Sequence, residues 1–190
     1  MGGAVQPDDR SMRFPRMQLT RRRDAASDEA FTEFAASSQA RLRRTAYLLC
    51  GDWDRAADHV QEGLVRLYVR WPRLVRDGSE LAYARKAVVS AFLDASRRRS
   101  STEVPREDDP TVGSGEDVAA AVTDRAALLS ALADLPERQR ACVVLRYFED
   151  LDVRATAAAL GCTEGTVKSQ TSRALSSLRS TLETERSLTW

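Results

Sequence analysis

The sequence predicts an all-α protein built from two small helical domains joined by a flexible acidic linker. Apolar residues recur at three- and four-residue steps through most of the chain, which is the pattern of amphipathic helices. No stretch shows the apolar–polar alternation of a β-strand over a useful length. A run rich in acidic residues, Gly, Ser and Pro interrupts the helical pattern near its middle. A chain of 190 residues is long enough for two such domains.

The N-terminal end predicts a disordered arm followed by a first helix. Residues 1–27 hold six arginines and little periodicity, which favours a disordered basic arm. The N-terminal domain is expected over residues 28–100. Gly51 can end its first helix in the left-handed conformation, and Asp52 can cap the next one. The buried face of the first helix is expected to comprise Phe31, Phe34, Ala35, Ser38, Leu42, Thr45, Ala46 and Leu49.

Two further helices complete the predicted N-terminal domain. The second is expected to end at about Trp71, because Pro72 pushes the residue before it out of the helical region. The third is expected from roughly Leu81 to Arg98. His59 lies beside the apolar stripe of the second helix, so it is expected at the helix surface.

The acidic run separates this domain from a second one. Residues 101–118 carry six acidic residues against one arginine, and such a segment cannot bury enough apolar surface to order itself. The C-terminal domain is expected over residues 119–184, followed by a tail at 185–190. Pro136 suits the first turn of a helix, where a missing N–H costs nothing. Its core is expected to include Leu128, Leu129, Leu132, Leu135, Val143, Val144, Tyr147 and Phe148.

The end of this domain has the proportions of a helix-turn-helix. A short helix is expected from Val153 to Leu160, Gly161 suits the sharp turn, and the Thr163 hydroxyl can cap the second helix. Val167, Ala174 and Leu178 are expected to face inward. The outward residues are then Lys168, Ser169, Ser172 and Arg173.

This outward face is typical of a helix that reads DNA. Residues 165–182 contain neither Glu nor Asp. Hydroxyls and cations on one helix face suit the bases and phosphates of a major groove. The alternative is a solvated face on a small bundle, which the glycine turn alone would favour. The lack of acidic residues favours DNA binding.

Composition argues against other classes of protein. No run approaches the roughly 18 apolar residues of a membrane span, and no secretory signal is present, so a cytoplasmic protein without membrane insertion is expected. Cys50, Cys142 and Cys162 form no C-x-x-C pair, and the chain has one histidine, so neither a metal site nor a cofactor is expected. A P-loop and a G-x-G-x-x-G motif are absent, and we do not expect an enzyme.

Four segments carry a resemblance to a known family. They are AADHVQEGLVRLYVRW (56–71), AYARKAVVSAFLDASRRR (82–99), LADLPERQRACVVLRYFEDL (132–151) and LGCTEGTVKSQTSRALSSL (160–178). In this order, and on both sides of a linker, they resemble the sigma-70 family of RNA polymerase sigma factors. Within it, the chain is similar to the extracytoplasmic-function type and its SigE-like actinobacterial branch. The resemblance covers about residues 28–183.

The resemblance implies a role for each candidate residue. Residues 28–100 correspond to sigma region 2, which binds core polymerase and the −10 promoter element, and 119–184 to region 4, which binds the −35 element. Contacts with the clamp helices of the largest subunit are expected from Asp58, Gln61 and Glu62. Contacts with the −10 element are expected from Tyr83, Arg85, Lys86, Ser90, Arg97 and Arg98. Contacts with the −35 element are expected from Thr163, Thr166, Lys168, Ser169, Ser172 and Arg173.

Each assignment has a plainer alternative. The polar face of Asp58 and Gln61 could be ordinary solvated surface, and an aromatic residue such as Tyr83 could belong to the core. Cations at a helix C-terminus, such as Arg97, are also favoured by the helix dipole. The chain departs from the family at Ser90, where asparagine is common, and at Thr156, where a bulky aliphatic is usual.

The resemblance also implies partners. These are core RNA polymerase, through its clamp helices and β flap, promoter DNA, and an anti-sigma factor that grips both domains. The alternative is a free-standing helix-turn-helix regulator that binds DNA without acting as a polymerase subunit. Such a regulator would need a ligand pocket or phosphoacceptor domain, and the N-terminal half shows the pattern of neither.

Overall fold

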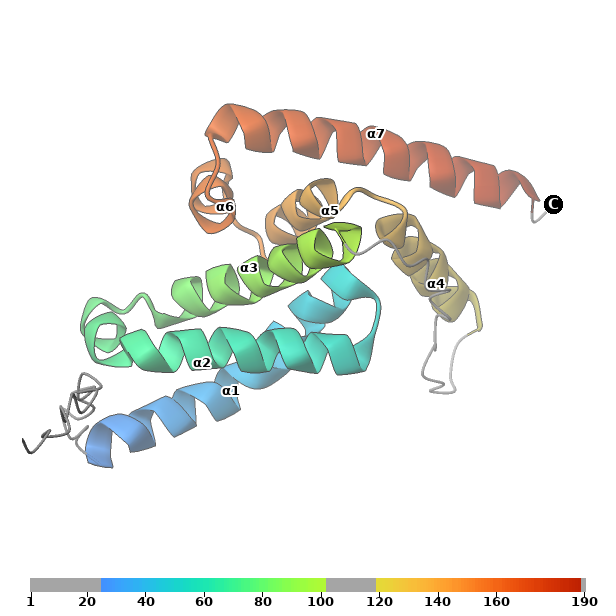
Figure 1. The fold of residues 1–190 in the computed structure, drawn as a ribbon. Helices are drawn as coiled ribbons and strands as arrows, with labels where there is room; N and C mark the ends of the chain where they lie inside the picture. The colour runs from blue at the N-terminus through green and yellow to red at the C-terminus, as the bar shows by residue number, and fades with distance from the viewer. Residues whose placement is uncertain (1–24, 102–118, 189–190) are drawn as a thin grey trace, which may run out of the picture.

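The computed structural model describes residues 25–101 and 119–188. All regular elements of these residues are helical, and Figure 1 shows α1–α3 packed together beside α4–α7. The predicted all-α class is therefore confirmed. The predictions made for residues 1–24, for the linker at 102–118 and for the last two residues lie outside the described residues.

The N-terminal half consists of α1 (Ala25–Cys50), α2 (Trp53–Asp77) and α3 (Glu80–Ser101). Gly51 takes a φ of 72° between the first two helices. The Asp52 carboxylate then accepts hydrogen bonds from the backbone N–H groups of Asp54 and Arg55, at 2.8 and 2.7 Å. Both the glycine turn and the aspartate cap agree with the sequence prediction.

The predicted end of α2 at Pro72 is wrong. The helix continues through this proline to Asp77, and Gly78 ends it with a φ of 62°. An interior proline costs a helix about 3 kcal/mol or more. Burial of the preceding Trp71 offsets this cost, because its ring lies 5.3 Å from the rings of both Phe31 and Phe34. Tertiary packing therefore outweighs the local preference.

α2 packs closely against α3 at Gly63. A β-carbon added to this glycine would lie 2.7 Å from Val88 Cγ2 and 3.1 Å from the Val88 backbone nitrogen. At such distances Val88 or the backbone must shift to accept a side chain. The absence of a side chain at Gly63 therefore allows α2 and α3 to pack closely at this point.

His59 is buried, which corrects the prediction of a surface position. Its side of α2 is covered by α3, and its ring lies 6.0 Å from the ring of Phe92 in an edge-to-face arrangement. In the sequence, His59 lies beside the apolar stripe of α2. In the structure, α3 covers a wider part of the α2 surface than this stripe, and His59 lies within the covered part.

The C-terminal half begins with α4 (Ala119–Ala133) and α5 (Glu137–Val143) and ends with α6 (Val153–Leu160) and α7 (Glu164–Leu188). Leu132 and Leu135 pack with residues of α7, as expected. Leu128 is exposed, contrary to the prediction. It lies one turn before Leu132 on α4, outside the cluster that Leu132 and Leu135 form with α7.

A π-helical segment, η1 (Val144–Phe148), follows α5 and alters which residues are buried. The backbone N–H of Glu149 donates to the carbonyl of Val144 at 3.0 Å, five residues back. This wider turn leaves Tyr147 and Phe148 60% and 48% exposed, and it buries Glu149 to 3% exposure. The prediction that both aromatic residues continue the core is wrong, because it assumed an α-helical period.

The two halves share one hydrophobic core. Ala141, Val144 and Leu145 of the C-terminal half lie in the same buried cluster as Ala46 and Phe92 of the N-terminal half. The Arg140 guanidinium adds a polar contact by donating to the carbonyl of Leu49 at 2.6 Å. This packing has no local marker in the sequence, since each half has an apolar stripe sufficient for a core of its own.

Candidate nucleic-acid interface

The helix-turn-helix forms from α6, at its predicted bounds, and α7, which continues to Leu188, beyond the domain end predicted at 184. Asp152 caps α6 by accepting a hydrogen bond from the Ala155 backbone N–H at 2.6 Å. Gly161 forms the turn with a φ of 62°. The Thr163 hydroxyl then accepts a hydrogen bond from the Thr166 backbone N–H at 3.1 Å, which caps α7.

One side of α7 is buried and the other is open to solvent. Val167, Ala174 and Leu178 are buried, as expected. The exposed residues on the open side are Thr163, Lys168, Ser169, Ser172 and Arg173, and Thr166 is half-buried beside them. This face offers hydroxyl and cationic donors, which bind phosphates and base edges, and no acidic residue lies between positions 165 and 182.

Thr156 in α6 does not weaken the packing behind this face. Its side chain is fully buried, and its hydroxyl donates to the carbonyl of Asp152 at 2.8 Å. A buried hydroxyl is costly only without a hydrogen-bond partner. The departure from the usual aliphatic residue is therefore accommodated within α6.

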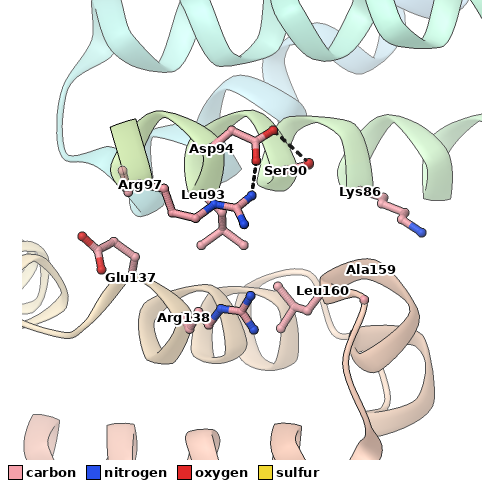
Figure 2. A pocket seen from close by; sticks show the side chains of 11 residues that line it. Lys86, Ser90, Leu93, Asp94, Arg97, Glu137, Arg138, Ala159 and Leu160 are labelled. Carbon is pink, nitrogen blue, oxygen red and sulfur yellow. Dashed lines mark hydrogen bonds and ion pairs between the residues drawn. The ribbon is translucent and has the colours of Figure 1, made fainter. Parts of the chain in front are cut away.

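A second group of candidate residues lines a groove between α3 and the C-terminal half. Figure 2 shows Lys86, Ser90 and Arg97 of α3 facing Arg138 of α5 and Leu160 of α6 across this groove. Its volume is about 720 Å³. The groove brings together three of the six residues expected to contact the −10 element.

Within the groove, Asp94 partly neutralises the cations. Its carboxylate pairs with Arg97 and Arg66, and the Ser90 hydroxyl lies 3.4 Å from it. Partial burial alone would raise the pKa of Asp94, but hydrogen bonds from Arg97 and Arg66 outweigh this and hold the pKa below its ordinary value. Lys86 is exposed at the other end of the groove.

The remaining −10 candidates do not share this groove. Tyr83 is half-buried against the core, and the Arg70 guanidinium lies 5.7 Å from its ring centre. Arg98 is exposed near the end of α3. The Arg85 side chain is only 11% exposed, and its Nε lies 2.7 Å from a Glu149 carboxylate oxygen. Arg85 thus points into the contact between the two halves.

Glu149 is a buried charged residue that was not among the predicted site residues. Its carboxylate is fully buried between α1 and α3, where Arg41 approaches to 2.9 Å and Arg85 to 2.7 Å. The Thr45 hydroxyl donates to its other oxygen. No local pattern marks Glu149, because its burial depends on the π-helical turn and on the packing of the two halves.

The exposed polar face of α2 continues into exposed apolar surface. Asp58 and Gln61 are exposed, whereas Glu62 pairs with Arg66. Val65 and Val69 continue the exposed line along the helix at 65% and 69% exposure. In the sequence, Val65 and Val69 could have been noticed as apolar residues that do not lie on the buried stripe of α2.

The N-terminal and C-terminal halves each match a family. Residues 34–102 match Sigma-70 region 2, and residues 125–178 match Sigma-70, region 4. The chain is 39% identical over 153 residues to the RNA polymerase sigma-E factor of Streptomyces avermitilis, covering 80% of this chain and 85% of that relative. It is 33% identical over 148 residues to the ECF RNA polymerase sigma factor SigL of Mycobacterium tuberculosis, covering 75% and 82%. The chain belongs to the sigma-70 family, as an extracytoplasmic-function sigma factor.

Solved structures show the same fold for this sigma factor. The sigma factor RpoE of Bartonella quintana, solved with the anti-sigma factor NepR, aligns with a TM-score of 0.64 at 24% identity over 82% of this chain and 98% of that one. CnrH, solved with the cytosolic domain of CnrY, aligns with a TM-score of 0.61 at 20% identity over 83% and 90%. The region 2 match leaves the alternative of a free-standing regulator without support.

The described part of this sigma factor has neither a metal-ligand cluster nor a membrane-spanning helix. Residues 25–101 and 119–188 contain no cluster of His, Cys, Asp or Glu that could hold a metal ion. Across the same residues, no helix has the length and apolar character needed to cross a bilayer. Burial, with the neighbouring Cys162, raises the pKa of the Cys142 thiol to about 11, so this thiol stays protonated.

Proposed function

We propose that this sigma factor directs promoter-specific initiation with three separate surfaces. The exposed face of α7 contacts the −35 element, the basic side of α3 contacts the −10 element, and the open face of α2 binds core polymerase. The observation that carries the proposal is the α7 face, where Lys168 and Arg173 stand beside exposed hydroxyls on a helix-turn-helix.

The −10 contact is proposed for the end of region 2. Lys86, Arg97 and Arg98 supply cations along α3, and Ser90 supplies a hydroxyl between them. Melted promoter DNA needs neutralised phosphates and a surface for its bases. Because Ser90 is shorter than asparagine, it reaches fewer hydrogen-bonding groups on a base, and we expect a −10 preference that differs from that of asparagine-containing relatives.

The polymerase contact is proposed for α2. Asp58 and Gln61 can pair with basic residues of the clamp helices, and Val65 and Val69 add apolar surface that is otherwise left in water. Region 4 is expected to bind the β flap. In this role the protein acts in the cytoplasm as a polymerase subunit and catalyses no reaction of its own.

We also propose an anti-sigma partner. A sigma factor with this fold, RpoE of Bartonella quintana, was solved with the anti-sigma factor NepR, and CnrH, which has the same fold, was solved with the cytosolic domain of CnrY. Candidates in both halves, Asp58 and Gln61 of α2 and Lys168 and Arg173 of α7, are exposed, so a partner that spans both halves can reach them. Affinity purification from uninduced native cells tests this proposal: recovery of polymerase subunits alone would contradict it.

The central test of the proposed function is transcription in vitro. Purified sigma factor is added to sigma-free core polymerase on a DNA library with randomised −35 and −10 elements. We expect transcripts that start downstream of one shared sequence pair and that disappear in a Lys168→Ala and Arg173→Ala double variant. Failure of the correctly folded wild type to support any initiation would contradict the proposed function.

A further inference from the structure

Two of the three cysteines of this chain line the same small cavity in region 4. Cys142 lies on α5 and is 1% exposed, whereas Cys162 lies in the turn between α6 and α7 and is half-buried. The cavity has a volume of about 10 Å³, which is roughly the space of one water molecule. The two thiols are therefore neighbours in the fold, although they are far apart in the sequence.

The electrostatics of Cys142 agree with this proximity. Burial is the main cause of its raised pKa, and the charge of Cys162 raises the pKa of this thiol further. A like charge has this effect only on a nearby group. The cavity lining and the electrostatic coupling thus indicate the same pair of thiols.

The two thiols differ in their access to solvent. Cys162 is partly open, and it directly precedes Thr163, whose hydroxyl caps α7. The N-terminal end of a helix stabilises negative charge, which favours a thiolate as nucleophile. Cys142 is covered, so a small oxidant in solution meets Cys162 first. An accessible thiol beside a second, shielded one is a common arrangement for reversible cysteine oxidation.

The third cysteine has a different environment. Cys50 lies at the end of α1 and packs in the core that the two halves share. Its thiol donates to the carbonyl of Asp52 at 3.2 Å, and burial raises its pKa. Cys50 does not line the cavity of the other two thiols, so it is an internal control for their reactivity.

We propose that Cys142 and Cys162 form a reversible oxidation site, at which a hydroperoxide joins them in a disulfide between α5 and the helix-turn-helix. The Cys162 thiolate attacks one peroxide oxygen, the O–O bond breaks, and the other oxygen takes up a proton and leaves as an alcohol or water. The Cys142 thiol then attacks the sulfenic sulfur of Cys162. The S–S bond forms as the S–O bond breaks, and the hydroxyl leaves as water with the proton of Cys142. Two thiols are oxidised to one disulfide, and one hydroperoxide is reduced.

The bond restrains the helix that carries the proposed −35 face. A disulfide requires its β-carbons to lie about 3.8 Å apart, so its formation closes the cavity. The first turn of α7 begins at Glu164, two residues after Cys162, and is drawn toward α5. Thr166 and Lys168 are then presented in a changed orientation. This consequence for DNA rests on the proposed function, whereas the oxidation itself does not.

The first test measures the oxidation without DNA. The reduced full chain is treated with hydrogen peroxide, denatured in iodoacetamide and analysed by peptide mass spectrometry. We expect a bridged peptide that joins Cys142 to Cys162 within one chain, an alkylated Cys50, and loss of the bridge in dithiothreitol. Three alkylated thiols, or bridges that join different chains, would overturn the proposal.

Two variants make the oxidation test specific. Cys50→Ala should form the same bridge as the wild type. Cys142→Ala lacks the second thiol, and its Cys162 should therefore accumulate a sulfenic acid that dimedone traps. Absence of the dimedone adduct from Cys162 would overturn the proposed order of the two steps.

The second test measures the consequence for DNA. The probe is a fluorescein-labelled duplex that carries the −35 sequence recovered by transcription in vitro. We expect the oxidised chain to bind it at least about fivefold more weakly than the reduced chain, the lower end of typical coupling between sites. Dithiothreitol should restore the affinity, and Cys162→Ser should bind equally before and after peroxide.

The outcomes separate this inference from the proposed function. Equal affinities of the oxidised and reduced wild type would overturn the restraint of α7. The same loss of affinity in peroxide-treated Cys162→Ser would place the oxidation elsewhere and overturn the site. Failure of the reduced chain to bind any −35 duplex would instead contradict the proposed function, and the mass-spectrometric test of the disulfide would be unaffected.

Discussion

At the scale of single residues, His59 links stability to pH. It is 6% exposed, and its Nε2 has no hydrogen-bond partner among the described residues. Burial, together with the charges of Arg55 and Arg99, lowers the pKa of His59 below its ordinary value of 6.5. The unfolded chain therefore binds this proton more readily, and the contribution to stability is complete above pH 6.5 and falls as the pH drops below it.

Replacement of His59 by glutamine should reduce this pH dependence. Between pH 6.5 and 5.5 the wild type should lose up to about 1.4 kcal/mol of unfolding free energy through this residue, the limit for one proton over one pH unit. Urea unfolding at both pH values measures the loss. Since His59 is the only histidine in the chain, an equal loss in His59→Gln would contradict the assignment.

Gly63 offers a second test at this scale. Gly63→Ala should reduce the free energy of unfolding by about 1–3 kcal/mol, the usual cost of overpacking, because the new methyl would meet Val88 at 2.7 Å. Gly165→Ala is the matched control, because its nearest neighbour would be 3.8 Å away and the site is helical. Thermal unfolding compares the two, and equal stabilities would contradict the close helix contact.

At the scale of helices, α7 should divide its contacts between bases and phosphates. Lys168→Ala or Arg173→Ala should cost about 1–3 kcal/mol of binding to the preferred −35 sequence where the side chain contacts a base. A uniform loss on all sequences with a shallower salt dependence would identify a phosphate contact. Arg179→Ala, exposed further along α7, is the control. Fluorescence anisotropy over a series of salt concentrations measures both quantities.

The exposed face of α2 should govern association with polymerase. Asp58→Ala with Gln61→Ala should weaken co-purification with core polymerase and leave DNA binding by α7 intact. Glu33→Ala with Gln39→Ala, on the exposed side of α1, makes a similar change in chemistry away from this face. Unchanged recovery of core polymerase with the α2 double variant would make this face ordinary solvated surface.

Several helices could be predicted from the sequence because their limits depend on local chemistry. Gly51 and Gly161 end helices in the left-handed backbone conformation, which glycine adopts at little cost. Asp52 caps the next helix as expected. The failures depend on long-range packing. α2 passes through Pro72 because Trp71 is held by α1, and no periodicity argument includes that contact.

The candidate sites were predictable to different extents for the same reason. The α7 face follows from a helical period and one turn, and both are local. Glu149 and the buried position of Arg85 follow from the π-helical turn and the contact between halves, which have no local signature. Tyr147 and Phe148 were wrongly assigned to the core because the prediction used an α-helical period across this π-helical turn.

At the scale of the whole molecule, the shared core predicts cooperative unfolding. Ala141, Val144 and Leu145 pack with the core of region 2, so loss of one half exposes apolar surface of the other. We expect a single calorimetric transition whose van't Hoff and calorimetric enthalpies agree. Two resolved transitions would contradict a common core. Leu145→Ala should lower the single transition as a whole, with a loss of about 2–5 kcal/mol.

The length of α7 has a mechanical consequence. Its 25 residues make a rod about 37 Å long, at 1.5 Å per residue. Lys168 stands near one end, and the contacts of Leu178 and Leu182 with the α4 side lie toward the other. A tilt of about 10° around one end of such a rod moves the other by roughly 6 Å. We therefore expect a change in the packing of α7 against α4 to alter the orientation in which Lys168 is presented.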